Sequence, residues 1–277
     1  MRQLLSTVQS ALAHRYLVKR DVGRGSMAGV FLAWDHDRKC DVAIKVLRPE
    51  FGPTIIAERF RREIAFVTTL DHPNILPILD FGEADGLTYF TMPFAHGDTL
   101  GSRISKDGPL SIAEALSIVR DLAAAIDHAH SKQIIHRDIK PQNVVFEKSR
   151  AMICDFGIAR ALESAGRERL SSSGLVMGTP EYMSPEQASG QWDIGQATDI
   201  YALGCVTYAM LAGAPPFSAA TTQAVLARHL AAKVPSLRIV RPEVSQQIER
   251  AVERALAKKP RERPGSATEL AEELGAM

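Results

Sequence analysis

The sequence predicts an α+β fold with two lobes: a small antiparallel sheet with one helix, then a larger, mainly helical part. Its 277 residues are enough for two lobes with a substantial core. Short β-branched and aromatic runs separated by Gly and Asp dominate residues 16–93. After Gly97 the pattern becomes helical. We therefore expect a lead-in at 1–15 and lobes at 16–93 and 94–277, with a ligand cleft between the lobes.

The first lobe is expected to hold five strands interrupted by one helix. Phe60, Ile64, Val67 and Leu70 recur at spacings of three and four, which indicates a helix in "AERFRREIAFVTTL". The opening residues 1–15 show only weak apolar periodicity, which suits a docking helix and a disordered lead-in equally. The predicted strands are "YLVKRDVG", "GVFLAWD", "CDVAIKVL", "ILPILDF" and "LTYFTM".

The second lobe is expected to begin its helices at Ser111. This residue can cap the run "IAEALSIVRDLAAAIDHAHSK", and Glu114 follows at the capping-box spacing. We find no internal repeat and no low-complexity tract in the chain. Further helices are predicted near 196–212, 219–231, 244–257 and 266–274.

Composition excludes several classes of protein. The formal net charge of +1 argues against a general nucleic-acid binder. The three cysteines are widely spread and form no C-x-x-C pair, which favours free thiols in a reducing compartment. Residues 200–217 are the longest apolar stretch, but they end in Gly and Pro and suit a buried helix better than a membrane span. We expect a cytoplasmic protein.

A glycine turn precedes a lysine strand. "VGRGSMAGVFLAW" places Gly23 and Gly25 between two strands, where glycine lets backbone N–H groups approach phosphate oxygens. Many hairpins carry two glycines, so this turn alone is weak evidence. In "VAIK" the period of two puts Ala43 and Lys45 on one face. Glu63 faces the apolar side of the predicted helix and needs a partner, which Lys45 can supply.

The polar run "HRDIKPQN" at 136–143 lies between two apolar runs. Asp138 could accept a proton from a substrate hydroxyl, Lys140 could neutralise a phosphoryl group, and Asn143 could bind a metal ion. "DFG" follows twelve residues after Asn143, and Asp155 supplies the carboxylate oxygen that Mg²⁺ prefers. A structural turn explains any one of these motifs, but not all of them in this order.

The sequence resembles the Hanks-type protein kinases from about residue 16 to its end. Lys140, two positions after Asp138, is typical of the serine/threonine members. The segments "DFGIAR", "GTPEYMSPEQ" and "TDIYALGCVTYAMLAGAPPF" look most like the bacterial members. The resemblance implies a bilobal protein-kinase fold and a serine/threonine kinase that transfers the γ-phosphate of ATP to protein hydroxyls.

The resemblance also implies the cofactors and the site: ATP with Mg²⁺, for which Mn²⁺ can substitute. Lys45, paired to Glu63, binds the α- and β-phosphates. Asp138 is the base that orients the hydroxyl, and Asn143 and Asp155 hold Mg²⁺. The residues expected around ATP are Val22, Gly23, Gly25, Val30, Ala43, Lys45, Met92, Pro93, Ala95 and Val145.

Two features of the hinge and loop depart from the family pattern. Pro93 stands where a backbone carbonyl accepts a hydrogen bond from adenine, and proline retains this carbonyl. The backbone N–H that donates to adenine is expected from Ala95. Ala28 replaces the third glycine of the loop.

Other residues are expected to organise the site rather than to react. Asp199 should hold the 136–143 loop from beneath, and Glu186 should pair with Arg263. Thr179 is expected to bridge Asp138 and Lys140. A column of Val67, Ile78, His136 and Phe156, with Gly157 after it, should link the lobes.

Residues 155–186 correspond to the activation segment. A phosphate on Ser171 or Ser173 would add negative charge that Arg137 can bind, which predicts activation by autophosphorylation in trans. The expected partners are protein substrates, a second copy of the chain, and a homodimer through the first lobe, with no nucleic acid. The alternative to a free cytoplasmic protein is the intracellular domain of a membrane-anchored receptor kinase.

Two rival functions remain open on the sequence alone. A pseudokinase normally lacks Lys45, Asp138, Asn143 or Asp155, and all four are present. Phosphotransfer to a small molecule is disfavoured by "GTPEYMSPE", which in the family shapes a groove for a peptide.

Overall fold

The computed structural model describes residues 2–24, 28–47, 64–156, 179–191 and 194–276. Contacts divide these residues into two compact units. The first contains 2–24, 28–47, 64–71 and 76–96, and the second contains 72–75, 97–156, 179–191 and 194–276.

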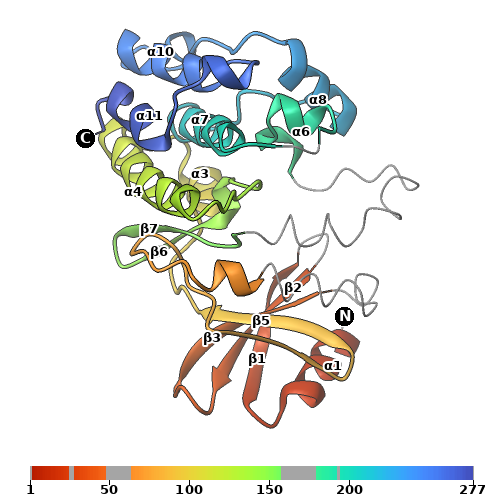
Figure 1. Cartoon of the computed structure of the whole chain (residues 1–277). Helices are drawn as coiled ribbons and strands as arrows, with labels where there is room; N and C mark the ends of the chain where they lie inside the picture. The colour runs from red at the N-terminus through yellow and green to blue at the C-terminus, as the bar shows by residue number, and fades with distance from the viewer. Residues whose placement is uncertain (1, 25–27, 48–63, 157–178, 192–193, 277) are drawn as a thin grey trace. The chain divides into compact units, whose positions relative to one another are not determined.

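The described part of the first unit is built on a five-stranded sheet with the order β1-β2-β3-β5-β4 (Figure 1). All neighbouring strands are antiparallel, and β1 carries two register shifts, between Val18 and Arg20 and between Asp21 and Gly23. Such irregularities twist an edge strand and end its pairing locally. The strands are β1 (Tyr16–Arg24), β2 (Ala28–Asp35), β3 (Cys40–Leu47), β4 (Asp80–Ala84) and β5 (Leu87–Pro93).

The lead-in residues form a helix, α1 (Arg2–Leu12), which packs on β1. Val8 and Leu12 are fully buried in the same apolar cluster as Tyr16 and Phe31. The side-chain amide of Gln9 accepts a hydrogen bond from Val18 N at 2.8 Å and donates to Tyr16 O at 3.4 Å. These bonds occupy backbone groups of an edge strand that would otherwise face solvent. Of the two interpretations left open, the docking helix is confirmed.

The predicted strand "ILPILDF" is wrong in its first half. Pro77 has no backbone N–H to give to a ladder, so strand pairing begins only at Asp80. Ile75 instead makes an isolated parallel bridge with Ile153 in the second unit's own hairpin. The predicted helix around 57–70 is described only from Ile64, where residues 64–67 are helical.

The second unit is mainly helical. Its longer helices are α3 (Leu100–Asp107), α4 (Ile112–Ser131), α7 (Ala197–Ala212), α8 (Thr222–Ala231), α10 (Gln246–Ala255) and α11 (Ala267–Leu274). Shorter turns are η2 (Pro141–Asn143), η3 (Pro180–Tyr182), α6 (Pro185–Ala188), α9 (Leu237–Val240) and η4 (Pro260–Glu262). A two-stranded antiparallel hairpin, β6 (Val144–Glu147) with β7 (Arg150–Ile153), completes it.

Helix α7 forms the centre of this unit. Every residue from Thr198 to Leu211 is buried, and α4, α10 and α11 all pack against α7 (Figure 1). A helix that is apolar on all sides is stable only when other elements surround it. The apolar stretch that begins at residue 200 therefore belongs to a buried core helix, as the sequence predicts.

Polar caps explain where the helices begin. Ser111 accepts a hydrogen bond from Glu114 N at 3.2 Å, as the capping-box spacing predicts. Thr99 does the same for α3 at Ser102 N, at 3.0 Å. Sequence reasoning missed α3 because Leu100 is its one buried residue, so it has no apolar stripe to recognise.

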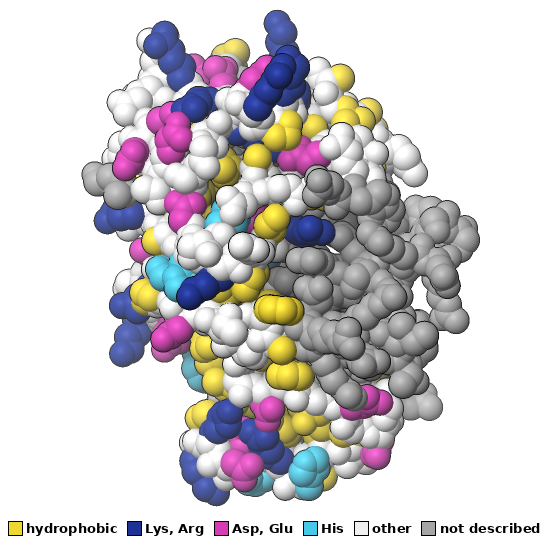
Figure 2. Space-filling model, viewed as in Figure 1, with side chains coloured by type: hydrophobic (Ala, Val, Ile, Leu, Met, Phe, Trp, Pro, Cys, Tyr) yellow, Lys and Arg dark blue, Asp and Glu magenta, His cyan; other side chains and the backbone are white. Residues whose placement is uncertain are grey.

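On the face shown in Figure 2, basic and acidic side chains lie beside one another over the helical unit. Within the described ranges, no helix has both the length and the hydropathy needed to cross a membrane.

Candidate active site

The 136–143 loop folds around the carboxylate of Asp138. Lys140 Nζ donates to Asp138 Oδ2 at 2.7 Å, and Asn143 Nδ2 donates to the same oxygen at 3.2 Å and to Asp138 O at 2.8 Å. The Asp138 side chain is 28% exposed and that of Lys140 is 16% exposed, so ligands can reach both. The structure thus brings together the acid, the base and the amide that the sequence singles out.

Asp199, at the start of α7, holds the loop in place. Its side chain is fully buried and accepts hydrogen bonds from His136 N and Arg137 N, both at 2.8 Å. His130 Nε2 bonds the same carboxylate at 2.8 Å. Burial opposes the charge on Asp199, but these donors outweigh burial and keep the pKa of the carboxyl below its ordinary value. The backbone at Arg137 has a left-handed φ of 68°, a strained conformation that this support maintains.

The ring of His136 orients the backbone beside Asp138. Nδ1 accepts a hydrogen bond from Asp138 N at 3.2 Å, so the ring hydrogen lies on Nε2, which donates to Cys154 O at 3.0 Å. The ring also contacts Phe156 edge-on, with centroids 4.5 Å apart. His136 and Phe156, two members of the predicted column, therefore touch, whereas Val67 and Ile78 belong to the first unit.

Asn143 and Asp155 are placed side by side along the backbone. Cys154 N donates to Asn143 O at 2.9 Å, so the residue before Asp155 is bonded to Asn143. Asp155 has a left-handed φ of 70°, a conformation that is uncommon outside glycine but that aspartate adopts more readily than most residues. An amide oxygen and a carboxylate are hard oxygen donors, which suit Mg²⁺ that keeps phosphate oxygens and waters as its other ligands. The donor set therefore fits the metal ion that the sequence predicts.

The sheet of the first unit carries several of the other predicted ligand residues. Lys45 is the register partner of both Val30 and Phe90, and Ala43 is the partner of Met92. Lys45 is half-buried, and its ammonium lies 5.9 Å from the centre of the Phe90 ring.

Two backbone positions of this unit are suited to a close ligand approach. A Cβ atom added at Gly23 meets nothing within 4 Å, so packing does not explain this glycine. Pro93 ends β5, and in the described part of the chain the N–H of Ala95 bonds to no backbone carbonyl. Val22 is exposed and lies in β1, while Val145 of the second unit lies in β6.

Several predicted residues lie outside the described ranges. They are Gly25, Glu63, Gly157, Ser171 and Ser173, so the expected Lys45–Glu63 pair and the phosphosites stay predictions.

Thr179 is expected to bridge Asp138 and Lys140, and this stays a prediction. Among the described residues, its hydroxyl makes no hydrogen bond to Asp138 or Lys140. Thr179 instead precedes the 180–182 turn and accepts a backbone hydrogen bond from Tyr182 N at 3.1 Å.

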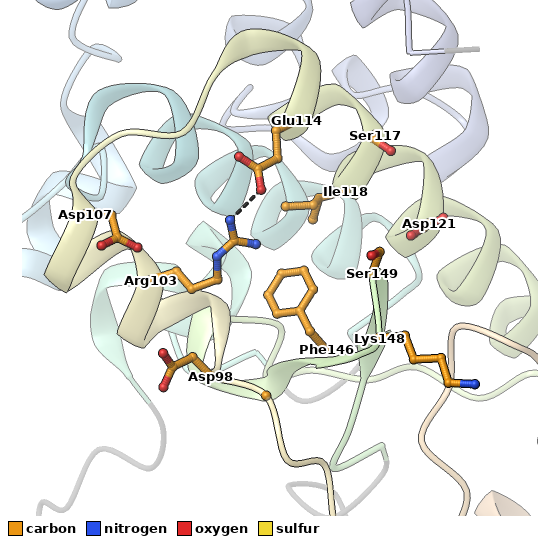
Figure 3. A pocket seen from close by; sticks show the side chains of 11 residues that line it. Asp98, Arg103, Asp107, Glu114, Ser117, Ile118, Asp121, Phe146, Lys148 and Ser149 are labelled. Atoms are coloured by element: carbon orange, nitrogen blue, oxygen red, sulfur yellow. Dashed lines mark hydrogen bonds and ion pairs between the residues drawn. The ribbon is translucent and has the colours of Figure 1, made fainter.

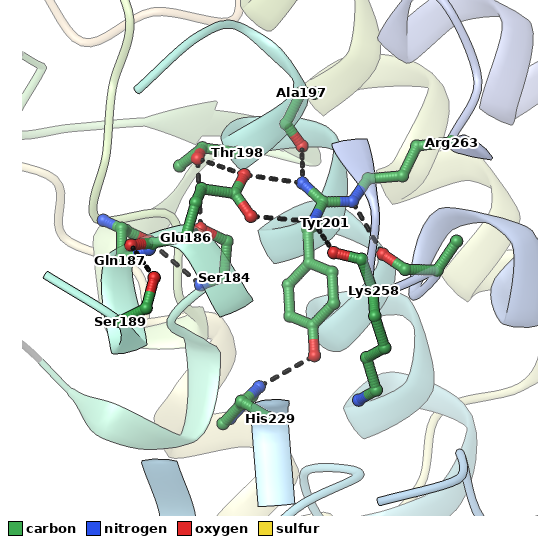
Figure 4. Close-up of polar contacts among 11 residues, drawn as sticks. Ser184, Glu186, Gln187, Ser189, Ala197, Thr198, Tyr201, His229, Lys258 and Arg263 are labelled. Atoms are coloured by element: carbon green, nitrogen blue, oxygen red, sulfur yellow. Dashed lines mark hydrogen bonds and ion pairs between the residues drawn. The ribbon is translucent and has the colours of Figure 1, made fainter. Parts of the chain in front are cut away.

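Glu186 and Arg263 form a buried, bidentate ion pair (Figure 4). Arg263 Nη1 and Nη2 donate to the two oxygens of Glu186 at 2.7 and 2.8 Å, and Thr198 donates to the same carboxylate at 2.7 Å. Burial raises the cost of the charge, yet Arg263 holds the pKa of Glu186 below its ordinary value. Arg263 also lies over the ring of Tyr201 at 4.9 Å.

Sequence reasoning missed two supporting residues. Gln187 Nε2 donates to Arg137 O at 2.7 Å, which connects α6 with the 136–143 loop. His130, for which the sequence predicts no role, bonds Asp199. No local pattern marks either role, because each depends on a partner at least 50 positions away.

A separate cavity of about 430 Å³ lies among α3, α4 and the β6–β7 hairpin (Figure 3). Phe146 and Ile118 supply its apolar surface, and Arg103 lies over the Phe146 ring at 4.8 Å while paired with Glu114. The residues of the 136–143 loop are not among those that line it.

Comparison with known proteins agrees with this geometry. Residues 16–274 match the model of the protein kinase domain. The chain belongs to the protein kinase family. The match leaves α1 outside it, although α1 packs on the first strand of the sheet.

Several curated relatives of this kinase domain are bacterial serine/threonine-protein kinases. It is 41% identical to the serine/threonine-protein kinase PrkC of Bacillus subtilis over 90% of this chain and 38% of the relative. It is 41% identical to the probable serine/threonine-protein kinase PknB of Lactococcus lactis, over 89% of this chain and 39% of that protein. It is 38% identical to the serine/threonine-protein kinase PknB of Mycolicibacterium smegmatis, over 97% of this chain and 44% of that protein. The chain thus spans less than half of each of these relatives.

Proposed function

We propose that this kinase domain transfers the γ-phosphate of ATP to serine or threonine hydroxyls of proteins. The observation that carries the proposal is the 136–143 loop, in which Lys140 and Asn143 surround the carboxylate of Asp138 while Asp199 holds the backbone. A strained loop held by a buried carboxylate is unnecessary for an ordinary turn. The names of the relatives support serine and threonine as the acceptors.

The residues have separate tasks in this reaction. Asp138 accepts a hydrogen bond from the acceptor hydroxyl and orients its oxygen towards the phosphorus. Lys140, 2.7 Å from Asp138, can move from this carboxylate to a phosphate oxygen and offset developing negative charge. Lys45, held by Glu63, binds the α- and β-phosphates.

Asn143 and Asp155 would hold Mg²⁺, which supplies charge neutralisation at the phosphates when it is bound. The same proposal includes the residues that the resemblance places around ATP. They are Val22, Gly23, Gly25, Val30, Ala43, Met92, Pro93, Ala95 and Val145. Regulation by phosphate on Ser171 or Ser173, recognised by Arg137, is its second part.

Three further expectations extend the proposal beyond the reaction. They are pairing of two copies through the first unit, a cytoplasmic location, and origin within a membrane-anchored receptor kinase. The relatives, which are more than twice as long as this chain, leave room for additional domains.

A transfer assay tests the central proposal. Radiolabelled γ-phosphate from ATP and Mg²⁺ is offered to the protein itself and to myelin basic protein, with wild type beside Asp138→Asn. Label with wild type and none with the variant supports a protein kinase. Equal label in both indicates a contaminating kinase. Nucleotide binding without any label supports the pseudokinase, and equal transfer to free serine supports a small-molecule kinase.

A further inference from the structure

One buried histidine has no part in the chemistry proposed above. His229 lies in the second half of α8 and is 0% exposed. Its ring contacts Phe217 edge-on at 4.9 Å, and α8 packs against η3, the 180–182 turn. The histidine therefore lies between the core helix α7 and the turn that precedes α6.

The contacts of the ring determine which nitrogen carries its hydrogen. Tyr201 Oη lies 2.8 Å from Nδ1 (Figure 4). Burial lowers the pKa of His229 to about 4, so the ring is neutral at physiological pH and has one N–H group. The carbonyls of Pro180 and Glu181 act in the opposite direction and favour the protonated ring, as nearby acceptors do. Nδ1 then accepts from Tyr201, and Nε2 carries the hydrogen.

The N–H group at Nε2 is buried, and among the described residues it makes no hydrogen bond. A buried donor without a hydrogen bond costs desolvation free energy. A small movement of the turn that brings a carbonyl to the ring would therefore be favourable. The residues of the 180–182 turn are themselves only half-buried. The segment after it is held firmly, since Arg263 binds Glu186 and Gln187 binds the Arg137 carbonyl.

We propose that His229 is a positioning residue for the protein acceptor. When an acceptor peptide lies against the 180–182 turn, Nε2–H bonds the carbonyl of Pro180 or Glu181 and holds the turn on α8. The inference rests on the proposed function, because it assumes that the acceptor is a protein. It deepens that function by assigning part of acceptor recognition to a residue that touches no substrate.

Two amide variants separate the two nitrogens of the ring. The amide of Gln reaches the position of Nε2, whereas that of Asn reaches only the position of Nδ1. His229→Gln can therefore still donate to the turn, and His229→Asn can still accept from Tyr201. We would measure KM for myelin basic protein, KM for ATP, and the slow transfer of phosphate from ATP to water without an acceptor.

His229→Asn is expected to raise KM for the acceptor about fivefold to tenfold, the factor typical of one buried hydrogen bond. Its KM for ATP and its ATP hydrolysis should stay within about twofold of wild type, and His229→Gln should keep all three within that range. Equal rises in both variants would overturn the inference. So would a parallel rise in KM for ATP, or no change in either variant.

Tyr201→Phe keeps the proposal testable if His229→Asn does not fold. This variant retains the imidazole but removes the donor that fixes its orientation, so a smaller rise in acceptor KM with unchanged ATP hydrolysis is expected. An unchanged acceptor KM then counts against the inference. Failure of the proposed function looks different, because wild type itself would transfer no phosphate to protein.

Discussion

At the scale of single residues, Asp138 and Asp199 show how surroundings divide the work of two carboxylates. The Asp138 side chain is 28% exposed and paired with Lys140, so it can meet a ligand. That of Asp199 is 0% exposed and accepts two backbone N–H groups and His130. The exposed acid is suited to chemistry, whereas the buried acid stabilises the backbone that presents it.

Exchanging each acid for its amide should separate these tasks. Asp199→Asn should lower the free energy of unfolding by about 3 kcal/mol, because an amide cannot accept all three of its donors. Asp138→Asn should change it by less than about 1 kcal/mol, since this side chain reaches solvent. Urea denaturation of both variants checks this, and Asp199→Asn with unchanged stability would contradict it.

Both variants, Asp138→Asn and Asp199→Asn, should be less active than wild type, but for different reasons. Asp138→Asn should reduce phosphate transfer by about 10²–10⁴-fold, the range for loss of a general base. Asp199→Asn should reduce it as well, because the strained Arg137 backbone loses its support. The transfer assay with myelin basic protein measures both. Full activity of Asp138→Asn would contradict the assignment of the base.

The pH dependence of stability should reflect Glu186. Its folded-state pKa is lowered, mainly by Arg263 against the effect of burial. A carboxyl with a lowered pKa stabilises the fold fully above its unfolded pKa of about 4.3, and this contribution disappears as the pH falls through the folded value. Glu186→Gln should cost about 3–5 kcal/mol at pH 7, because it leaves Arg263 buried without a charged partner.

The difference between wild type and Glu186→Gln should therefore shrink as the pH falls below about 4. Unfolding in urea at a series of pH values measures it. Glu186→Gln combined with Arg263→Met is the control, since it also removes the unpaired cation and should recover part of the loss. A constant difference across the pH range would show that the ion pair is not its source.

At the scale of elements, α1 shows what a helix outside the family match can add. It covers the edge strand β1 through Gln9 and buries Leu12 completely. The sequence does not predict this, because its periodicity is weak and the partner surface comes from strands of the sheet. Helix α3 was missed for a related reason: a helix held by its caps, with little apolar surface, has no distinct pattern.

A matched pair of leucines tests the contribution of α1. Leu12 is 0% exposed in the cluster with Tyr16, whereas Leu17 on β1 is 51% exposed. Leu12→Ala should lower the free energy of unfolding by about 2–4 kcal/mol through lost burial and a cavity. Leu17→Ala should change it by less than about 1 kcal/mol. Thermal and urea unfolding measure both, and equal effects would show that α1 does not stabilise the sheet.

At the scale of the whole molecule, predictability follows the range of the interactions involved. The core helix α7 and the strands β2 and β3 were predictable because period and apolar content are local properties. The polar residues of the 136–143 loop were predictable because their order is distinctive. The supports of that loop from Gln187 and His130, and the place of His229 beneath the 180–182 turn, arise from residues distant in sequence. Only the folded chain shows them.

The last prediction concerns two molecules rather than one. If the activation segment is phosphorylated in trans, wild type should label inactive Asp138→Asn chains, and labelling of wild type alone should accelerate with protein concentration. The expected acceptors are Ser171 and Ser173, so Asp138→Asn that also carries Ser171→Ala and Ser173→Ala should take up little label. Intact-mass measurement of a size-tagged Asp138→Asn chain, mixed with untagged wild type, separates the two species. Label confined to wild type, at a rate per molecule independent of concentration, would instead mean that each chain phosphorylates itself.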